Sequence, residues 1–453
     1  MSSDLKKYHF VGIGGIGMCG LAEYLLHCGH SVTGSDLNPS ENTDRLEKLG
    51  AVIKFGHRRE NVGDCDILVY SSAVRPENPE RTIAVERGIP TIRRAEMLGQ
   101  IFALKPVRIA ISGTHGKTTT TSMIGQVMTT AGMDPLIIGG GVLKTSGSPV
   151  RIGDGDIVIA EADEFDKSFL QLSPTHAIIT TIEDEHLDCY GNLENILSAF
   201  YQFTAKVPDS GRVVACSDEK EIPGFLRGLD RPFVTYGLNA ESDFQARDVR
   251  LDGNGSTFDA FHNDRLLGTI KLSVPGLHNV KNAMATVATA TLLEVPFAVI
   301  RDGLSEFRGV KRRFEIIKAT NELMLVDDYA HHPTEIEATL NAARKGWQRR
   351  IVAVFQPHLY SRTLHFYKAF ARVLQIADVI ILLEIYAARE APLDGVTGQM
   401  IFDEIRKTRQ SDVFFAGNKE NALALIKDIK KTGDMIITLG AGDVNKVLNG
   451  LMT

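Results

Sequence analysis

The chain has 453 residues, of which 43% are hydrophobic and 23% charged, and its formal net charge is −6. This length predicts about three domains, and the composition is that of a soluble globular protein. The acidic balance offers no basic face to a nucleic acid, and no apolar run approaches the roughly 20 residues that span a membrane. The five cysteines are scattered without a CxxC pair, which argues against a disulfide or zinc scaffold. The N-terminus lacks the apolar core of a signal peptide, so we expect a cytoplasmic protein with neither a nucleic-acid nor a membrane partner.

A glycine-rich turn dominates the first block of the chain. The expected elements around it are strands at 8–13, 31–35 and 66–70 and a helix at 18–27. The turn has the pattern GxGxxG, with glycines at Gly12, Gly14, Gly15 and Gly17. Asp36, about 20 residues further on, is placed to accept a hydrogen bond from a ribose hydroxyl. The pattern predicts a pyrophosphate site. It leaves open whether the ligand is a nicotinamide dinucleotide or a UDP-sugar, and a tight turn without a ligand is the structural alternative.

A second glycine turn lies between an expected strand at 107–112 and an expected helix at 117–130. Backbone N–H groups of such a turn point into one concavity, and the helix N-terminus adds positive charge. Lys117 is placed to bridge the terminal phosphates of ATP, and the Thr118 hydroxyl to bind Mg²⁺. Ile111 occupies the first glycine position of GxxxxGK[ST], so the loop is a shortened variant. The predicted ATP-binding residues here are Gly113, Thr114, His115, Gly116, Lys117, Thr118 and Thr119.

Two candidate magnesium ligands follow the next strands of this block. Glu161 comes directly after an expected strand, and His186 lies just beyond another. The carboxyl ends of strands in an open α/β sheet bind ligands, so we expect both side chains near the phosphates. A surface histidine in an acidic loop is the alternative for His186. The remaining elements expected in this block are strands at 157–160, 177–181, 212–216 and 256–261 and a helix at 278–293.

The third block begins near Gly309 and again alternates strands with helices. Its strands are expected at 324–327, 350–355, 379–384 and 434–439. Thr334 with Glu337 has capping-box spacing, which predicts a helix start just after residue 333. The whole chain is therefore predicted to be α/β with three domains: Rossmann-like over 1–104, P-loop ATPase-like with a mostly parallel sheet over 105–309, and Rossmann-like over 310–453.

Several long motifs resemble the Mur ligase family of peptidoglycan precursor synthesis. They are the first glycine turn, the loop 113–119, Glu161-Ala162-Asp163-Glu164, 183–191, 278–283, Arg313-Phe314-Glu315, 327–335 and Phe355-Gln356-Pro357-His358. Residues 188–191 and the motif at 355–358 favour the subfamily that adds L-alanine to UDP-N-acetylmuramate. The resemblance implies that ATP first converts the substrate carboxylate into an acyl phosphate, which the amine of alanine then attacks. We expect a monomer or homodimer.

The resemblance also implies roles for individual residues. Lys117, His186, Arg313 and Asp328 are expected to be catalytic, with Asn279, Arg313 and Asp328 also contacting ATP; an ordinary helix N-cap is the alternative for Asn279. Thr118, Glu161 and His186 are expected to bind Mg²⁺. The UDP-sugar is expected at Gly12, Gly14, Gly15, Gly17, Asp36, Ser71 and Ser72. The amino acid is expected at Tyr329, His331, His358 and Arg362, although Leu359 stands where many relatives have a basic residue.

Other functions leave part of this pattern unexplained. A nicotinamide-dependent oxidoreductase would account for the first 40 residues but not for the second phosphate loop. A regulatory nucleotide-binding protein would not need the histidine and arginine side chains of the third block. Within the family, the alternatives are a ligase that recycles a preformed tripeptide and ligases that add glutamate or a diamino acid.

Overall fold

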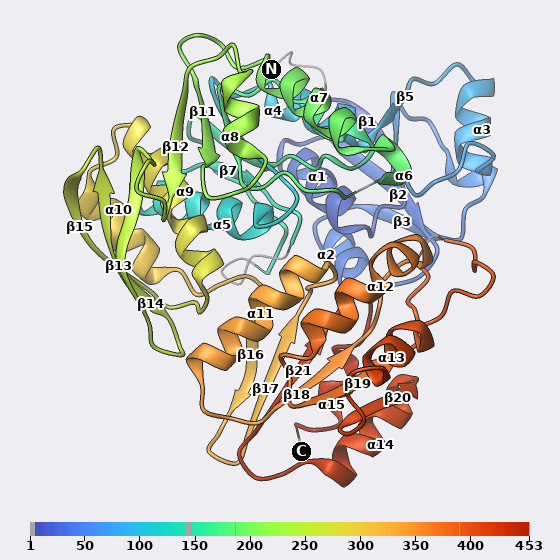
Figure 1. Ribbon diagram of the computed structural model, residues 1–453. Helices are drawn as coiled ribbons and strands as arrows, with labels where there is room; N and C mark the ends of the chain where they lie inside the picture. The colour runs from blue at the N-terminus through green and yellow to red at the C-terminus, as the bar shows by residue number, and fades with distance from the viewer. Residues whose placement is uncertain (1–4, 142–146, 186, 389, 453) are drawn as a thin grey trace. The chain divides into compact units, whose positions relative to one another are not determined.

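The computed structural model describes residues 5–141, 147–185, 187–388 and 390–452. Figure 1 shows its helices and strands, coloured from the N-terminus to the C-terminus. Its contacts divide the chain into two compact units. The first unit comprises Met1–Gln245, Ala260–Gly268 and Lys281–Leu304, and the second comprises Ala246–Asp259, Thr269–Val280 and Ser305–Thr453. No helix in the described ranges is long and apolar enough to cross a membrane.

The N-terminal part of the first unit is a five-stranded sheet in the order β3-β2-β1-β4-β5. Every neighbouring pair is parallel, and strands β2 and β3 lie on the opposite side of β1 from β4 and β5. This is the order of a Rossmann-like fold, with its topological switch point beside β1. The strands are β1 (Lys7–Val11), β2 (Ser31–Asp36), β3 (Val52–Phe55), β4 (Ile67–Tyr70) and β5 (Thr91–Arg93), and the helices are α1 (Ile16–His27), α2 (Glu41–Lys48), α3 (Pro79–Glu86) and α4 (Arg94–Phe102).

The phosphate-loop region of the first unit has a mostly parallel sheet in the order β12-β11-β10-β6-β9-β7-β8. Only the β7–β8 pair is antiparallel within this stretch. The strands are β6 (Val107–Ser112), β7 (Leu136–Ile138), β8 (Val150–Arg151), β9 (Ile157–Glu161), β10 (His176–Ile179), β11 (Arg212–Cys216) and β12 (Phe233–Gly237), and the helices are α5 (Lys117–Thr130), α6 (Leu187–Tyr190), α7 (Leu193–Thr204) and α8 (Ile222–Arg227). The residues of the elements that follow are divided between the two units: β13 (Phe244–Leu251), β14 (Ser256–His262), β15 (Arg265–Leu272), α9 (Leu277–Leu292) and α10 (Phe297–Glu306).

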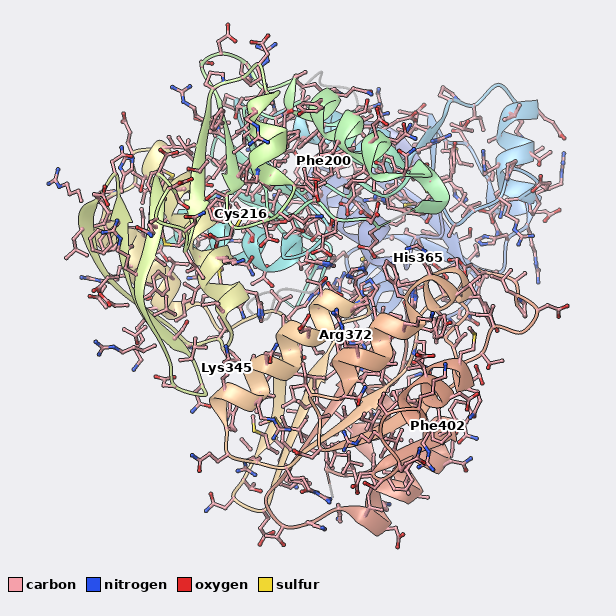
Figure 2. The ribbon with its side chains drawn as sticks, in the orientation of Figure 1. Phe200, Cys216, Lys345, His365, Arg372 and Phe402 are labelled. Atoms are coloured by element: carbon pink, nitrogen blue, oxygen red, sulfur yellow. The ribbon has the colours of Figure 1, made fainter. Side chains whose placement is uncertain are left out.

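Aromatic packing stabilises the helices beside this sheet. Phe200, on α7, lies among the packed side chains of the first unit (Figure 2). Its ring meets that of Phe169 edge-on at 5.2 Å between centroids, and Phe169 stacks on Phe203 at 4.8 Å. Edge-on and stacked aromatic pairs are favourable beyond the apolar area they bury. This cluster supports the segment that follows β9, which carries acidic side chains of the candidate site.

The C-terminal part of the second unit is a six-stranded sheet in the order β16-β17-β21-β18-β19-β20. Only the β16–β17 pair is antiparallel. One core cluster contains apolar residues of α11, α12 and α13, and a separate cluster contains those of α14 and α15, as expected for helices on both faces of a sheet. The strands are β16 (Glu315–Ala319), β17 (Leu323–Asp328), β18 (Ile351–Phe355), β19 (Val379–Leu383), β20 (Val413–Gly417) and β21 (Asp434–Leu439); the helices are α11 (Pro333–Gly346), α12 (Tyr360–Leu374), α13 (Gln399–Arg406), α14 (Lys419–Ile429) and α15 (Lys446–Asn449).

Four elements have the predicted bounds: β6 and α5, which flank the phosphate loop, and the strands β11 and β21. The first strand ends at Val11 rather than residue 13, because Gly12 turns the backbone to a φ of +80° and donates to the carbonyl of Ser35. The capping box at Thr334 is wrong. Helix α11 begins at Pro333, whose fixed φ suits the first helical position, and its N-cap is His332.

Candidate active site

The phosphate loop follows β6, a strand between β9 and β10 in a parallel sheet. Parallel strands bring their carboxyl ends to one edge, so the loop is flanked by the residues that follow both neighbours. Gly116 takes a left-handed φ of +82° as the N-cap of α5, and Lys117 is the first helical residue. The unpaired N–H groups of this helix N-terminus therefore border the loop, an arrangement that binds anions.

The side chain of Lys117 folds back over the loop. Its Nζ donates to the main-chain carbonyl of Gly113 at 2.7 Å and to both carboxylate oxygens of Glu164 at 3.0 and 2.9 Å. Burial lowers the pKa of Lys117, but the carboxylates of Glu164, Asp163 and Glu161 outweigh that effect and raise it overall. Burial raises the pKa of the Glu164 carboxyl to about 7, against the opposing effect of the Lys117 charge. The lysine is thus a fixed cation in the phosphate loop.

Thr118 and Glu161 meet as the sequence predicts. The Thr118 hydroxyl donates to Oε2 of Glu161 at 2.8 Å, and the Gly140 amide donates to the same oxygen at 2.9 Å. A Cβ on Gly140 would lie 2.6 Å from a Glu161 oxygen, so this close approach requires glycine. Glu161 is the last residue of β9 and pairs with Ile111, which places its carboxylate beside the start of the loop.

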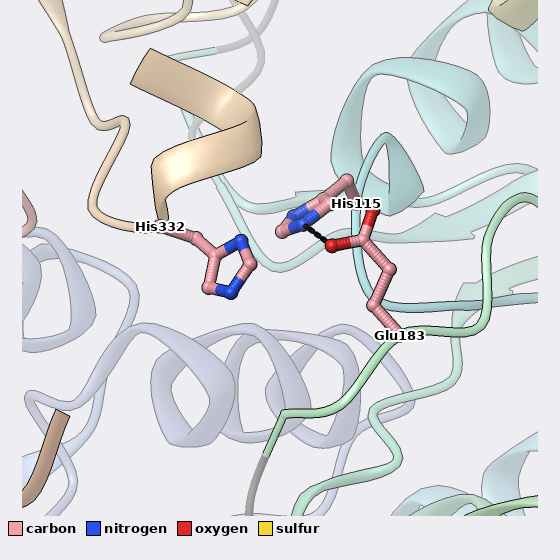
Figure 3. Close-up of side chains that lie close together, drawn as sticks. All are labelled: His115, Glu183 and His332. Carbon is pink, nitrogen blue, oxygen red and sulfur yellow. Dashed lines mark ion pairs between the residues drawn. The ribbon is translucent and has the colours of Figure 1, made fainter. Parts of the chain in front are cut away.

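Threonines after β10 form the opposite wall of the loop. Thr180 donates to the carbonyl of His115, and Thr181 accepts from the His115 amide at 2.9 Å through its hydroxyl. Figure 3 shows the side chains of His115 and Glu183, whose Nε2 and Oε2 lie 3.5 Å apart. The loop is therefore braced at several points by the segment that follows the neighbouring strand.

The N-terminal glycine loop is braced by Asp36. Its Oδ2 accepts from the Gly14 amide at 2.8 Å and its Oδ1 accepts from the Leu37 amide at 2.7 Å. A Cβ added to Gly12 would lie 3.5 Å from Ser71, so the predicted glycine turn and Ser71 are neighbours. Ser72 is exposed beside it. The structure brings these predicted residues together at the switch point of the first sheet.

A buried hydrogen-bond network around Glu80 connects to this glycine loop. Glu80 is fully buried and accepts from the Ser35 hydroxyl at 2.6 Å and from the Asn61 amide group at 2.6 Å, and it lies 3.1 Å from Nε2 of His9. The Ser35 carbonyl in turn accepts from the amides of Gly12 and the following residue. The sequence did not reveal the role of Glu80, because its hydrogen-bond partners lie on other elements and the residues next to it in the chain give no sign of them.

The residues predicted to bind the amino acid lie close together in the second unit. The centroid of the His331 ring lies 5.4 Å from that of Tyr329 and 6.0 Å from that of His358. Arg362 Nη1, in the first turn of α12, lies 3.4 Å from Nδ1 of His358, which precedes the helix. Tyr386 stacks on His358 at 5.8 Å between centroids and was missed by the sequence analysis. The cluster combines cationic and aromatic groups, which suits a small carboxylate ligand.

Asp328 and Arg313 have well-defined protein partners in the same unit. Asp328 accepts from the amides of Phe314 and Ala330, both at 2.8 Å, and from the Thr339 hydroxyl at 3.0 Å. Burial raises its pKa to about 6, while the Arg313 charge opposes the rise. Arg313 lies over the Tyr329 ring at 5.2 Å. Asp328 therefore fixes the backbone next to Arg313 and next to Tyr329, because it binds the amide that follows each of them.

Two further predictions have different outcomes. Asn279 is the third residue of α9, so its interpretation as a helix N-cap is wrong; its side chain donates to the carbonyl of Pro275 at 2.7 Å. His186 lies outside the described residues. The sequence analysis also missed Asn282, which is buried and accepts from the Thr120 hydroxyl at 3.2 Å in the first turns of α5.

Family models match nearly the whole chain in three consecutive segments. Residues 7–106 match the Mur ligase family catalytic domain, 111–290 the Mur ligase middle domain, and 312–442 the Mur ligase glutamate ligase domain. The chain belongs to the Mur ligase family. The predicted recognition and the three-domain α/β fold class are confirmed, whereas the exact domain boundaries stay a prediction.

Relatives within the Mur ligase family resemble the chain along its full length. It is 48% identical to a UDP-N-acetylmuramate–L-alanine ligase of Geotalea uraniireducens, over 99% of this chain and 97% of the relative. The corresponding ligase of Geobacter sulfurreducens is 47% identical over 98% and 96%. The crystal structure of UDP-N-acetylmuramate–alanine ligase from Thermotoga maritima superposes with a TM-score of 0.84 at 30% identity, covering 98% of this chain and 97% of that one. A murein peptide ligase from Psychrobacter arcticus superposes with a TM-score of 0.73 at 26% identity, covering 99% and 98%.

Proposed function

We propose that this chain joins L-alanine to the carboxylate of UDP-N-acetylmuramate at the expense of ATP, a step of peptidoglycan synthesis. The observation that carries the proposal is the 47–48% identity, along essentially the whole chain, to ligases named for this reaction. The phosphate loop supports the ATP part, because it combines a helix N-terminus with the ammonium of Lys117. The aromatic and cationic cluster around His358 supports an amino-acid ligand.

The reaction balances in two steps. A carboxylate oxygen of the sugar acid attacks the γ-phosphorus of ATP, which forms an acyl phosphate and releases ADP. The amine of alanine then attacks the activated carbonyl, gives up a proton, and expels phosphate as the amide forms. Phosphoryl transfer depends mainly on positioning and charge neutralisation, which the loop amides and Lys117 supply on the protein side.

Thr118 and Glu161 are proposed to bind Mg²⁺. Mg²⁺ binds oxygen ligands octahedrally at about 2.0–2.1 Å, which places adjacent ligands about 2.9 Å apart. The two side-chain oxygens are 2.8 Å apart, so they fit adjacent positions on one ion. When bound, Mg²⁺ neutralises phosphate charge. His186 is proposed as a further metal ligand from the sequence alone.

The remaining assignments divide among the substrates. The UDP-sugar is proposed to bind the glycine loop beside Asp36, Ser71 and Ser72, and alanine to bind at Tyr329, His331, His358 and Arg362. Asn279, Arg313 and Asp328 are proposed to contact ATP. These roles come from the family resemblance, and a monomer or homodimer and a cytoplasmic location stay predictions.

A coupled phosphate-release assay tests the function. The purified chain is given ATP, Mg²⁺ and UDP-N-acetylmuramate with single amino acids, and we expect release to depend on alanine. The same assay with a preformed tripeptide is the control for the recycling ligase. Phosphate release with the tripeptide but not with alanine would show that the chain is a recycling ligase. Phosphate release with neither would refute the proposal.

A further inference from the structure

Glu164 forms an ion pair with the lysine of the phosphate loop. A lysine ammonium has three hydrogens, and three oxygens lie within 3.0 Å of Lys117 Nζ. One is the carbonyl of Gly113 in the loop itself, and the other two are the carboxylate oxygens of Glu164. The Glu164 side chain is only 4% exposed. With the Thr114 carbonyl at 3.4 Å, four protein oxygens surround the ammonium, so a phosphate oxygen has to displace one of them.

The carboxylate is held in place rather than carried on a mobile surface side chain. The buried hydroxyl of Tyr190 donates to the main-chain carbonyl of Glu164 at 2.6 Å, and the amide of Lys167 donates to the same carbonyl at 3.0 Å. Asp166 and Lys167 both take left-handed φ values, 57° and 56°, which form the tight turn after Glu164. Such values are uncommon outside glycine, so surrounding contacts must hold this turn.

A bound triphosphate needs the same ammonium. Among the bonds that described residues make to Lys117 Nζ, those to Gly113 and Thr114 lie within the loop and are compatible with a phosphate in the concavity. The two bonds to Glu164 come from outside the loop and place negative charge beside it. A second anion on this buried cation would meet electrostatic repulsion. The phosphate oxygens therefore compete with the carboxylate oxygens.

We propose that Glu164 is a positioning residue that holds Lys117 against the Gly113 carbonyl while the loop is empty and is exchanged for phosphate oxygens when nucleotide binds. This inference rests on the proposed binding of ATP at this loop. The carboxylate keeps the lysine charged and folded back over the loop, and displacing it reduces the net binding free energy of the nucleotide.

The decisive variant is Glu164→Gln, which has nearly the same shape but no charge. We expect the dissociation constant for a non-hydrolysable ATP analogue, measured by calorimetry, to fall by about threefold to tenfold, because the competing anion is gone. Loss of a merely structural contact would leave the affinity unchanged or weaken it. Asp163→Asn is the matched control, since it removes the same charge from a side chain that accepts from the Phe165 amide instead of from Lys117. We expect it to strengthen binding less than Glu164→Gln does, because the Asp163 carboxylate acts on Lys117 only through its charge.

A measurement on the unmodified chain covers the case in which Glu164→Gln fails to fold. In a crystal structure with the analogue and Mg²⁺, we expect Lys117 Nζ to contact phosphate oxygens and to lie more than 4 Å from both oxygens of Glu164. A carboxylate still within 3 Å of Nζ, or unchanged or weaker binding by a folded Glu164→Gln variant, would overturn the inference while leaving ATP binding intact. Failure of the unmodified chain to bind the analogue would instead overturn the proposed function.

Discussion

Adding a single methyl group to Gly113 tests whether the phosphate loop works as its geometry implies. Gly113 has a φ of +128°, and a Cβ there would lie 2.3 Å from the Thr180 hydroxyl and 2.7 Å from the main-chain N and O of Thr181. Positive φ costs a non-glycine residue about 1–2 kcal/mol, and overpacking typically costs about 1–3 kcal/mol more. Gly132→Ala is the matched control, because Gly132 has a φ of +73° with nothing within 4 Å of the added atom. The φ of Gly113 also lies further from the left-handed helical region than that of Gly132. The difference between the two variants should therefore be at least the steric part, about 1–3 kcal/mol.

The assay compares the two variants in urea unfolding and in binding of a non-hydrolysable ATP analogue. We expect Gly113→Ala to unfold at lower urea and to lose at least tenfold in analogue affinity, because relief of the clash must move the loop away from Thr181. UDP-N-acetylmuramate affinity should stay within twofold, since the proposed site for that ligand is on a different sheet. Gly132→Ala should retain both ligands. If Gly113→Ala bound the analogue as well as Gly132→Ala does, the claim that this loop holds the triphosphate would be refuted.

Three further predictions concern other parts of the proposed site. Lys117→Ala should abolish phosphate release while calorimetry still detects UDP-N-acetylmuramate, and loss of both ligands in a folded variant would contradict separate sites. Arg362→Ala should raise the KM for alanine by about tenfold to a hundredfold, the value of a charged hydrogen bond, with the KM for ATP unchanged; equal changes in both would argue against a carboxylate contact. Burial opposes ionisation of Glu80, but hydrogen bonds from His9, Ser35 and Asn61 lower its pKa below the ordinary value of 4.5. The ionised carboxylate therefore stabilises the fold above pH 4.5, and this stabilisation is lost as the pH falls through the lowered pKa of the folded state. We expect Glu80→Gln to unfold at lower urea than the unmodified chain at pH 7, and the difference in unfolding free energy to disappear in acid. A difference that does not depend on pH would refute this reasoning.

The sequence predicted the strand and helix bounds that depend only on neighbouring residues. The bounds of β6 and α5, and the position of Lys117 at the helix start, follow from an apolar strand, a glycine turn and a helical stretch read in order. The end of β9 at Glu161 could be predicted in the same way, because strand direction alone places a terminal residue at the ligand-binding edge. Family resemblance then supplied the substrates, which no periodicity or spacing could identify.

Tertiary structure alone decided which side chains pair across the chain. Glu164 and Lys117 are 47 residues apart, and Glu80 and Ser35 are 45 residues apart. Nothing in the spacing of these residues distinguishes Glu164 from Asp163, its neighbour in an acidic run. The choice is made by the strand order β10-β6-β9 and by the tight turn after Glu164, which aim one carboxylate of that run at the lysine. A backbone pattern repeats within a few residues and can be read from sequence, whereas a buried ion pair depends on the packing of several elements at once.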